Sequence, residues 1–220
     1  MVINNIVVGD FMAAIRAARM PFQSFDRIDS YYTHSNDNGI KWDTVHIGKN
    51  DLALLQNLVK AGDSDAKFMR EIDVSVEITA PVYWLQELDT YKIGTVRNSS
   101  SLQHIGDRRD YIEKDFDASV NFQDELDTEI MESFIHSTIK TVNYFRKQYK
   151  KTNNYEFFRA MRKCMPMSFQ YTISWHSNYA VLRNIWRQRI KRPHRLKEWT
   201  EDFALFIDSL PYSKELIQHD

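Results

Sequence analysis

Strict alternation of apolar and polar residues marks one segment of the chain as a strand. In "DVSVEITA", Val74, Val76 and Ile78 alternate with polar residues, which is typical of a strand with one buried face. Pro81 follows and suits the first position of a helix. The apolar stripe of that predicted helix comprises Val82, Trp84, Leu85 and Leu88.

The longest helical period in the chain runs over residues 125–149. Its apolar residues recur every three or four positions, which predicts a long helix packed along one face. The residues assigned to that face are Ile130, Phe134, Ile135, Ile139, Val142 and Phe145.

The remaining pattern predicts a mixture of helices and strands. Asp10 is placed to cap a helix that Pro21 ends, and Asn-Asp-Asn-Gly inside residues 30–47 separates two β-prone runs as in a hairpin. A helix is expected at 50–61, further helices at 154–164, 178–190 and 194–208, and a strand at "MSFQYTISW". We expect one α+β domain spanning residues 1–220.

Composition narrows the class of protein. Of the 220 residues 43% are hydrophobic and 13% aromatic, as in a folded globular chain. No run approaches eighteen apolar residues and the start lacks a basic leader, so we expect no membrane association and a cytoplasmic location. The single cysteine, Cys164, excludes an internal disulfide framework, and no histidine pair has a helical zinc spacing, so no metal site is predicted.

A basic run, "RNIWRQRIKRPHRLK", raises two interpretations. It is either a solvated helix face or a surface that binds phosphates or nucleic acid. At about 100° per residue, Arg189 shares the apolar stripe of Asn178 and Leu182, whereas Arg183 and Arg187 point to the other side. A buried guanidinium needs an anion, so either a carboxylate of the chain or a ligand is expected beside Arg189.

Arg162 and Cys164, shortly before Pro166, are further candidate site residues. Arg162, in "RKCMP", has a setting similar to that of Arg189. Cys164 is a candidate nucleophile because nearby cations lower the pKa of a thiol, but its methionine neighbours favour a small core residue. The spacing reveals no Ser-His-Asp arrangement, so a hydrolase has little support.

The polar stretch "TYKIGTVRNSSSLQH" is either an ordinary loop or a surface that holds a phosphate or a base. It combines the flexible Gly94 with the cations Lys92 and Arg97. Its hydrogen-bonding side chains include those of Thr95, Asn98, Ser99, Ser100 and Ser101. It has neither a Walker nor a dinucleotide glycine pattern.

Two segments, about 64–104 and 159–199, resemble the flavin-dependent thymidylate synthases. That family carries Arg-His-Arg-x-x-Ser-x-Asn-x-x-Ser-x-Arg after a strand, Ala-Pro and a short helix. Here "VSVEITAPVYWLQELD" supplies the lead-in and "TYKIGTVRNSSSL" occupies the signature in register. The family continues with Arg-x-x-Leu-Pro, a threonine, and a helix that bears an asparagine and ends in an arginine. The matching residues here are Arg162, Met165, Pro166, Thr172, Asn178 and Arg189.

The signature is altered at several positions. Thr90, Tyr91 and Lys92 stand in place of Arg-His-Arg, Thr95 and Ser100 at the two serines, Arg97 in place of the asparagine and Leu102 in place of the last arginine. A flavin-holding stretch of the family aligns with "DAKFMRE", which places Arg70 where an acid is expected. His194 and Arg195 replace an Ala-Gln pair.

The resemblance implies a twisted, mainly antiparallel sheet flanked by helices, and a homotetramer with shared active sites. The implied reaction is reductive methylation of dUMP at C5 with methylenetetrahydrofolate, FAD and NADPH. Arg189 would be catalytic and orient the uracil. The implied nucleotide-binding residues are Glu87, Thr90, Asn98, Ser100, Arg162 and Arg189, and the FAD-binding residues are Tyr91, Lys92, Thr95, Arg97 and Asn178.

Two other functions stay open. The altered signature is compatible with a flavin-dependent C5 modification such as hydroxymethylation, acting on dUMP or another pyrimidine nucleotide. The third is a non-catalytic protein on the same scaffold that binds nucleotides or nucleic acid, although nucleic acid is not the expected partner.

Overall fold

The computed structural model describes residues 1–37, 40–192 and 194–219. The chain folds as two compact units. The first unit comprises Met1, Ile78–Thr90 and Asn98–Ile173, and the second comprises Val2–Glu77, Tyr91–Arg97 and Ser174–Asp220. The expectation of one domain stays a prediction.

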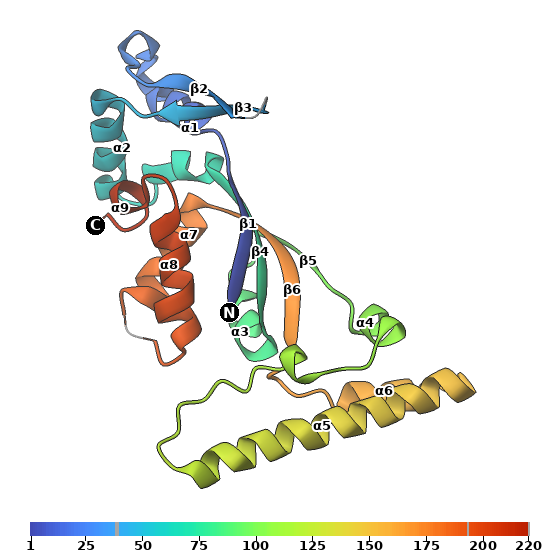
Figure 1. Ribbon diagram of the computed structural model, residues 1–220. Coiled ribbons are helices and arrows are strands. Elements are labelled where there is room, and N and C mark those ends of the chain that lie inside the picture. The colour runs from blue at the N-terminus through green and yellow to red at the C-terminus, as the bar shows by residue number, and fades with distance from the viewer. Residues whose placement is uncertain (38–39, 193, 220) are drawn as a thin grey trace. The chain divides into compact units, whose positions relative to one another are not determined.

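A four-stranded, mainly antiparallel sheet has the strand order β1-β4-β6-β5 (Figure 1). Its strands are β1 (Val2–Val8), β4 (Asp73–Pro81), β5 (Val96–Ser99) and β6 (Gln170–Asn178). The alternation in β4 is confirmed, since Val74, Val76 and Ile78 are buried. Helix α3 (Val82–Leu88) begins one residue later than predicted because Pro81 ends the strand and serves as the N-cap.

The first unit is built on α5 (Glu125–Thr152), which confirms the predicted long helix. Asp124 caps its start by accepting a hydrogen bond from the backbone N–H of Leu126, and Asn153 ends it in the left-handed region at φ 53°. Helix α6 (Tyr155–Lys163) packs beside α5, and α4 (Leu102–Arg108) and the short turn η4 (Glu113–Asp115) precede it in the chain (Figure 1). The core of this unit comprises Leu102, Tyr111, Phe116, Ile135, Val142, Met161 and Phe169.

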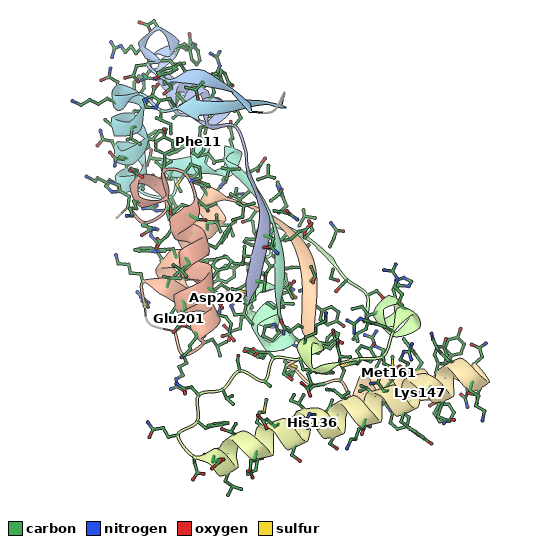
Figure 2. The ribbon with its side chains drawn as sticks, viewed as in Figure 1. Phe11, His136, Lys147, Met161, Glu201 and Asp202 are labelled. Atoms are coloured by element: carbon green, nitrogen blue, oxygen red, sulfur yellow. The ribbon has the colours of Figure 1, made fainter. Side chains whose placement is uncertain are left out.

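The apolar face predicted for α5 is only partly correct. Ile135 and Val142 are buried, but Ile130 is 60% and Phe134 50% exposed. At about 100° per residue, these two lie roughly 90–130° around the helix from the buried line. The sequence pattern therefore combined two separate stripes of the helix into one predicted face. Figure 2 shows Met161 of α6 beside α5, and His136 of α5 nearer the start of that helix.

The second unit contains most of the remaining helices. Its elements are α1 (Phe11–Arg19), η1 (Met20–Phe22), η2 (Phe25–Arg27), α2 (Lys49–Ala61), η3 (Ala66–Glu71), α7 (Tyr179–Ile185), η5 (Trp186–Ile190), η6 (Glu198–Phe203), α8 (Ala204–Ser209) and α9 (Ser213–Leu216). The Asp10 cap is confirmed, because its carboxylate accepts from the backbone N–H of Met12 at 2.7 Å. Phe11, which Figure 2 labels at the start of α1, packs edge-on against the rings of Tyr179 and Tyr212.

The predicted hairpin is formed by β2 (Tyr31–Asp37) and β3 (Ile40–His46), paired antiparallel from Tyr31 opposite His46 to Asp37 opposite Ile40. Residues 38 and 39 of its predicted turn lie outside the described residues. The edge strand β1 was not predicted, because "VINNIVV" does not alternate and its residues are mostly exposed.

A closed ionic network joins α1 to the start of α2. Arg19 is 5% exposed and its partner Asp51 is fully buried. The Nε and Nη2 atoms of Arg19 lie 2.6 and 2.5 Å from Oδ1 of Asp51. The other oxygen of Asp51 accepts hydrogen bonds from the backbone N–H and the hydroxyl of Ser30 and from the backbone N–H of Asp29. Both oxygens of this carboxylate therefore have donors.

Among the described residues, no helix has both the length and the apolar character that a membrane span requires.

Candidate functional site

Arg189 lies among aromatic side chains of the second unit. Its Nε donates a hydrogen bond to the hydroxyl of Tyr91 at 3.0 Å, and its Nη1 lies 3.0 Å from Nε2 of His194. Its guanidinium carbon stands 5.9 Å from the ring centre of Tyr91 and 5.7 Å from that of Trp199. These contacts fix both the position and the plane of a half-buried cation.

The helix that carries Arg189 changes its winding before reaching it. The predicted helix 178–190 consists of α7 and a π-helical turn, η5, in which the backbone N–H of Lys191 bonds the carbonyl of Trp186 at 2.8 Å. The α-helical period that placed Arg189 on the stripe of Leu182 therefore does not continue through Trp186. π-Helical turns are rare and frequent at functional sites.

The polar loop packs on the start of α7 within the second unit. Gly94 has φ +77°, and a Cβ there would lie 3.1 Å from Nδ2 of Asn178. Asn178 caps α7, since its side-chain oxygen accepts from the backbone N–H of Val181. Thr95 donates its hydroxyl hydrogen to the carbonyl of Tyr91 at 2.7 Å, which tightens the loop. Only glycine allows this close approach in this backbone conformation.

The first unit carries the other end of the polar loop. The backbone N–H of Ser100 donates to the carbonyl of Thr172 at 2.8 Å, and the backbone N–H of Thr172 donates to the hydroxyl of Ser100 at 3.3 Å. The hydroxyls of Thr172 and Thr79 are 2.8 Å apart. At the end of α3, Thr90 bonds the carbonyl of Glu87 through both its N–H and its hydroxyl. In each unit, then, hydrogen bonds join segments that are far apart in the sequence.

No protein-family model and no curated protein sequence matches the chain. Among solved structures it is similar to the flavin-dependent thymidylate synthase ThyX from Helicobacter pylori, complexed with FAD and dUMP, with 17% identity and a TM-score of 0.68 over 100% of this chain and 99% of the other. A second structure of the same enzyme with FAD and dUMP has 17% identity and a TM-score of 0.65 over 97% of both chains. The chain has the fold of the flavin-dependent thymidylate synthases. At this identity the similarity establishes the fold and not the reaction.

Arg162 and Cys164, at the end of α6, are more exposed than expected, whereas no burial was predicted for Lys92 or Asn98. Arg162 is exposed, with its guanidinium 6.0 Å from the ring centre of Phe158, so the expectation that it is held away from solvent is wrong for the single chain. Lys92 and Asn98 are also exposed. Cys164 is exposed rather than a core residue, because it follows the last turn of α6.

Leu102 departs most clearly from the signature. It is 6% exposed and belongs to the core of the first unit. Where the family signature has its last arginine, this chain therefore places an apolar side chain that packs inward at the first residue of α4.

The basic run is not a uniformly solvated face. Arg183 lies on the side opposite the stripe of Leu182, as predicted, but it is only 2% exposed. It contacts the carboxylate of Asp63 and the backbone carbonyls of Val59 and His219. The period of a helix identifies a face but not the residues that cover it.

Three partners of Arg189 and Tyr91 were not predicted as site residues. Gln188 accepts the hydroxyl hydrogen of Tyr91 at 3.1 Å, and Trp199 and His194 contact Arg189. Nδ1 of His194 also faces the backbone N–H of Leu196 at 3.2 Å. A neutral imidazole has a single acceptor nitrogen, so these two contacts compete for the tautomer. Trp199, ten residues after Arg189, carried no sequence signal beyond its size.

A serine, a histidine and an aspartate do meet on the polar face of β4 and β6. The hydroxyl of Ser75 lies 3.0 Å from Nδ1 of His176, and Nε2 of His176 lies 3.6 Å from Asp73. The second distance is too long for a hydrogen bond. The histidine is therefore not held as in a catalytic triad, and a hydrolase remains unsupported.

The loop residues fit a flavin nucleotide. Gly94 lets the loop pack directly against the side chain of Asn178, because a Cβ at position 94 would lie 3.1 Å from Nδ2 of Asn178. Lys92 is exposed and Arg97 half-buried, and both supply positive charge beside hydroxyl groups. That combination suits the phosphates of a dinucleotide.

Proposed function

We propose that this chain is an enzyme of the flavin-dependent thymidylate synthase type, which methylates dUMP reductively at C5 with methylenetetrahydrofolate, FAD and NADPH. The observation that carries the proposal is the pairing of the two signature segments in space. Gly94 packs on Asn178 and Tyr91 bonds Arg189 in one unit, and Ser100 bonds Thr172 in the other. The full-length similarity in fold supports it.

Arg189 is assigned the role of orienting the uracil and polarising its carbonyl. Tyr91 and Trp199 hold its guanidinium before any ligand arrives. A donor that is already fixed stabilises charge developing on the pyrimidine without reorganising during the reaction.

Nucleotide binding is assigned to residues that the signature positions define. Arg162 is exposed on α6 and can form charge-assisted hydrogen bonds to a phosphate, and Ser100 presents a hydroxyl beside Thr172. The other proposed nucleotide contacts are Glu87, Thr90 and Asn98.

Flavin binding is assigned to the loop and to the cap of α7. The residues are Tyr91, Lys92, Thr95, Arg97 and Asn178. FAD, once reduced by NADPH, would supply the hydride that converts the transferred carbon to a methyl group. The protein's part is to bind the flavin, to hold the pyrimidine and to keep water away from both.

Assembly into a homotetramer with shared active sites belongs to the same proposal, as does a cytoplasmic location. The exposed stripe of Leu126, Ile130 and Phe134 on α5 supports assembly, since these residues are 60%, 60% and 50% exposed and follow one another at helical spacing. Contiguous exposed apolar surface of this kind marks protein contacts.

A second candidate is a related C5 modification, such as hydroxymethylation, or a different pyrimidine nucleotide. Leu102 favours this candidate, because the side chain at the position of the family's last arginine is apolar and buried here and cannot bind a phosphate. The hydroxyl of Thr90 likewise donates a hydrogen bond to the carbonyl of Glu87. A site whose polar groups change is expected to select a different ligand.

The decisive experiment is a titration of the purified chain with FAD, followed by flavin fluorescence. We expect saturable binding that Gly94→Val weakens by at least about tenfold, because a side chain there meets Asn178. Arg192→Gln, an exposed residue of the basic run, is the matched control and should leave the affinity unchanged. A colourless protein that shows no FAD binding would instead favour the non-catalytic nucleotide- or nucleic-acid-binding alternative.

Product analysis separates the two enzymatic candidates. Reduced, FAD-loaded protein with dUMP and methylenetetrahydrofolate should yield dTMP by mass spectrometry, and Arg189→Gln should lower the rate by about 100-fold or more. A hydroxymethylated product, or conversion only of another pyrimidine nucleotide, would replace the first candidate by the second.

A further inference from the structure

An open cavity in the second unit lies between the start of α1, the hairpin of β2 and β3, and the turn that precedes α9. Its volume is about 810 Å³. None of its described residues belongs to the flavin or nucleotide residues proposed above, or to the two segments that resemble the flavin-dependent thymidylate synthases, so the inference does not rest on the proposed function. The described lining residues are Val8, Gly9, Asp10, Phe11, Tyr32, Val45, Pro211 and Tyr212.

The wall of this cavity is mainly aromatic and aliphatic. It includes the side chains of Phe11, Tyr32 and Tyr212. Pockets for small molecules usually measure about 300–1,000 Å³ and combine an apolar, aromatic wall with a few polar groups. Both the volume and the lining therefore suit an organic molecule. Asp10 and Tyr32 are exposed, so such a molecule can enter from solvent on their side.

The aromatic wall is held in place at Tyr212. The hydroxyl of Tyr212 accepts a hydrogen bond from the backbone N–H of Ile47 at 3.0 Å, and its ring packs edge-on against Phe11 with the ring centres 5.4 Å apart. The backbone of Tyr212 lies in the left-handed region at φ 53°, which is uncommon for a bulky residue. Because these contacts fix the ring before a ligand binds, binding costs less conformational entropy.

Asp10 gives the cavity its charge. It is the one charged side chain among the described lining residues. Its Oδ1 accepts from the backbone N–H of Met12 at 2.7 Å, and its Oδ2 accepts from the hydroxyl of Tyr32 at 2.9 Å. A carboxylate has about four lone-pair sites, so it can accept further hydrogen bonds. The N-terminus of α1 adds only about half an elementary positive charge, which leaves the negative charge of Asp10 dominant.

We propose that this cavity binds a small organic cation, whose ammonium group pairs with the carboxylate of Asp10 while its apolar body packs against the aromatic wall. Aromatic rings attract cations because the face of the ring is electron-rich. The carboxylate favours a cation further through a charge-assisted hydrogen bond. An anion of the same size would meet no cation among the described lining residues.

An NMR titration with three ligands of similar apolar body tests the preference for positive charge. The probes are phenethylamine, phenethyl alcohol and phenylacetate, which are positive, neutral and negative at neutral pH. We expect phenethylamine to shift the backbone amide signals of Gly9 and Tyr212 saturably, with a Kd of about 1 mM or below. It should bind at least about fivefold more tightly than the alcohol. The amide of Gly106, in the first unit, should not shift.

A pair of acid variants locates the ammonium group. Asp10→Asn removes the charge but keeps a side chain that caps a helix equally well, so the chain should fold normally. It should weaken phenethylamine about fivefold or more and leave the affinity for the alcohol unchanged. Asp26→Asn, an exposed acid that does not line the cavity, is the matched control and should change neither affinity.

A second pair of variants tests the aromatic wall. Tyr32→Leu removes one ring and should weaken phenethylamine about threefold. Tyr31→Leu is the control, because Tyr31 precedes Tyr32 on β2, where successive side chains point to opposite faces, and does not line the cavity. Its affinity for phenethylamine should equal that of the unmodified chain.

Each outcome supports or overturns a part of the proposal. Absence of saturable shifts at Gly9 and Tyr212 overturns the site itself. Equal affinity for the amine and the alcohol, or tighter binding of phenylacetate, overturns the preference for a cation, as does an equal loss in Asp10→Asn and Asp26→Asn. Equal losses in the two tyrosine variants remove Tyr32 from the site.

Discussion

Two buried arginines in the second unit are satisfied in opposite ways. Arg19 is 5% exposed and Arg183 is 2% exposed. The partner of Arg19 is Asp51, which is fully buried and lies 2.5 Å away. Arg183 forms an ion pair with Asp63, which is 80% exposed, lies 3.2 Å away and is shared with Arg187, and it also donates to the backbone carbonyls of Val59 and His219.

The difference separates an ion pair that is closed inside the fold from one whose acid stands mainly in water. A buried pair stabilises a fold only if its remaining lone pairs and protons are also bonded. Asp51 meets that condition through Ser30 and Asp29, so nothing is left for a ligand to improve. Asp63 is mainly exposed and contacts two guanidinium groups through one oxygen, so this ion pair is expected to contribute little to stability.

Removing the acid of the closed pair should have the largest effect. Asp51→Ala leaves Arg19 buried without its carboxylate, and such a loss costs about 3–5 kcal/mol in the free energy of unfolding. Urea denaturation measures it. Asp26→Ala, an exposed acid of the same region, is the control and should stay within about 0.5 kcal/mol of the unmodified chain. A loss below about 1 kcal/mol for Asp51→Ala would mean that the pair is not closed.

Removing Asp29, whose carboxylate bonds the backbone at Asp51, should lower the free energy of unfolding by less. Oδ1 and Oδ2 of Asp29 accept from the backbone N–H groups of Asp51 and Asn50 in the first turn of α2. Desolvation raises the pKa of Asp29, but these hydrogen bonds outweigh it and hold the pKa below its ordinary value. Asp29→Ala should cost about 1 kcal/mol, as for other residues that cap a helix.

The pH dependence of Asp29 has a definite sign. Because its pKa is lower in the folded state, the stabilisation is complete above the unfolded pKa of about 3.9 and is lost as the pH falls through the folded value. Denaturation at pH 6 and at pH 3 should therefore show a smaller difference between the unmodified chain and Asp29→Ala at pH 3. An undiminished difference would assign the effect to packing.

The sequence predicted elements whose pattern is local. Alternation in Val74, Val76 and Ile78 was sufficient for β4, and the long period was sufficient for α5, because a strand or helix with one buried face has its own characteristic period. The same periodicity failed on Ile130 and Phe134, which lie on a second stripe that the chain leaves exposed. It also placed Arg183 correctly on a face without revealing the residues that cover that face.

The candidate site is formed by contacts between residues that are far apart in the sequence, which local patterns do not predict. Tyr91 and Arg189 are 98 positions apart, and no local pattern joins them. The resemblance to flavin-dependent thymidylate synthases named both as site residues, but it did not predict their direct hydrogen bond. The contacts of His194 and Trp199 were missed because both residues follow the end of η5, and no helical period relates them to Arg189.

Removing the acid of the open pair should have the smallest effect on stability. Asp63→Asn is expected to change the free energy of unfolding by less than about 1 kcal/mol, because an exposed carboxylate contributes little through a long ion pair. Thermal unfolding of the two chains measures the difference. A loss comparable to that of Asp51→Ala would show that Asp63 is the structural partner of Arg183, and the contrast between the two arginines would disappear.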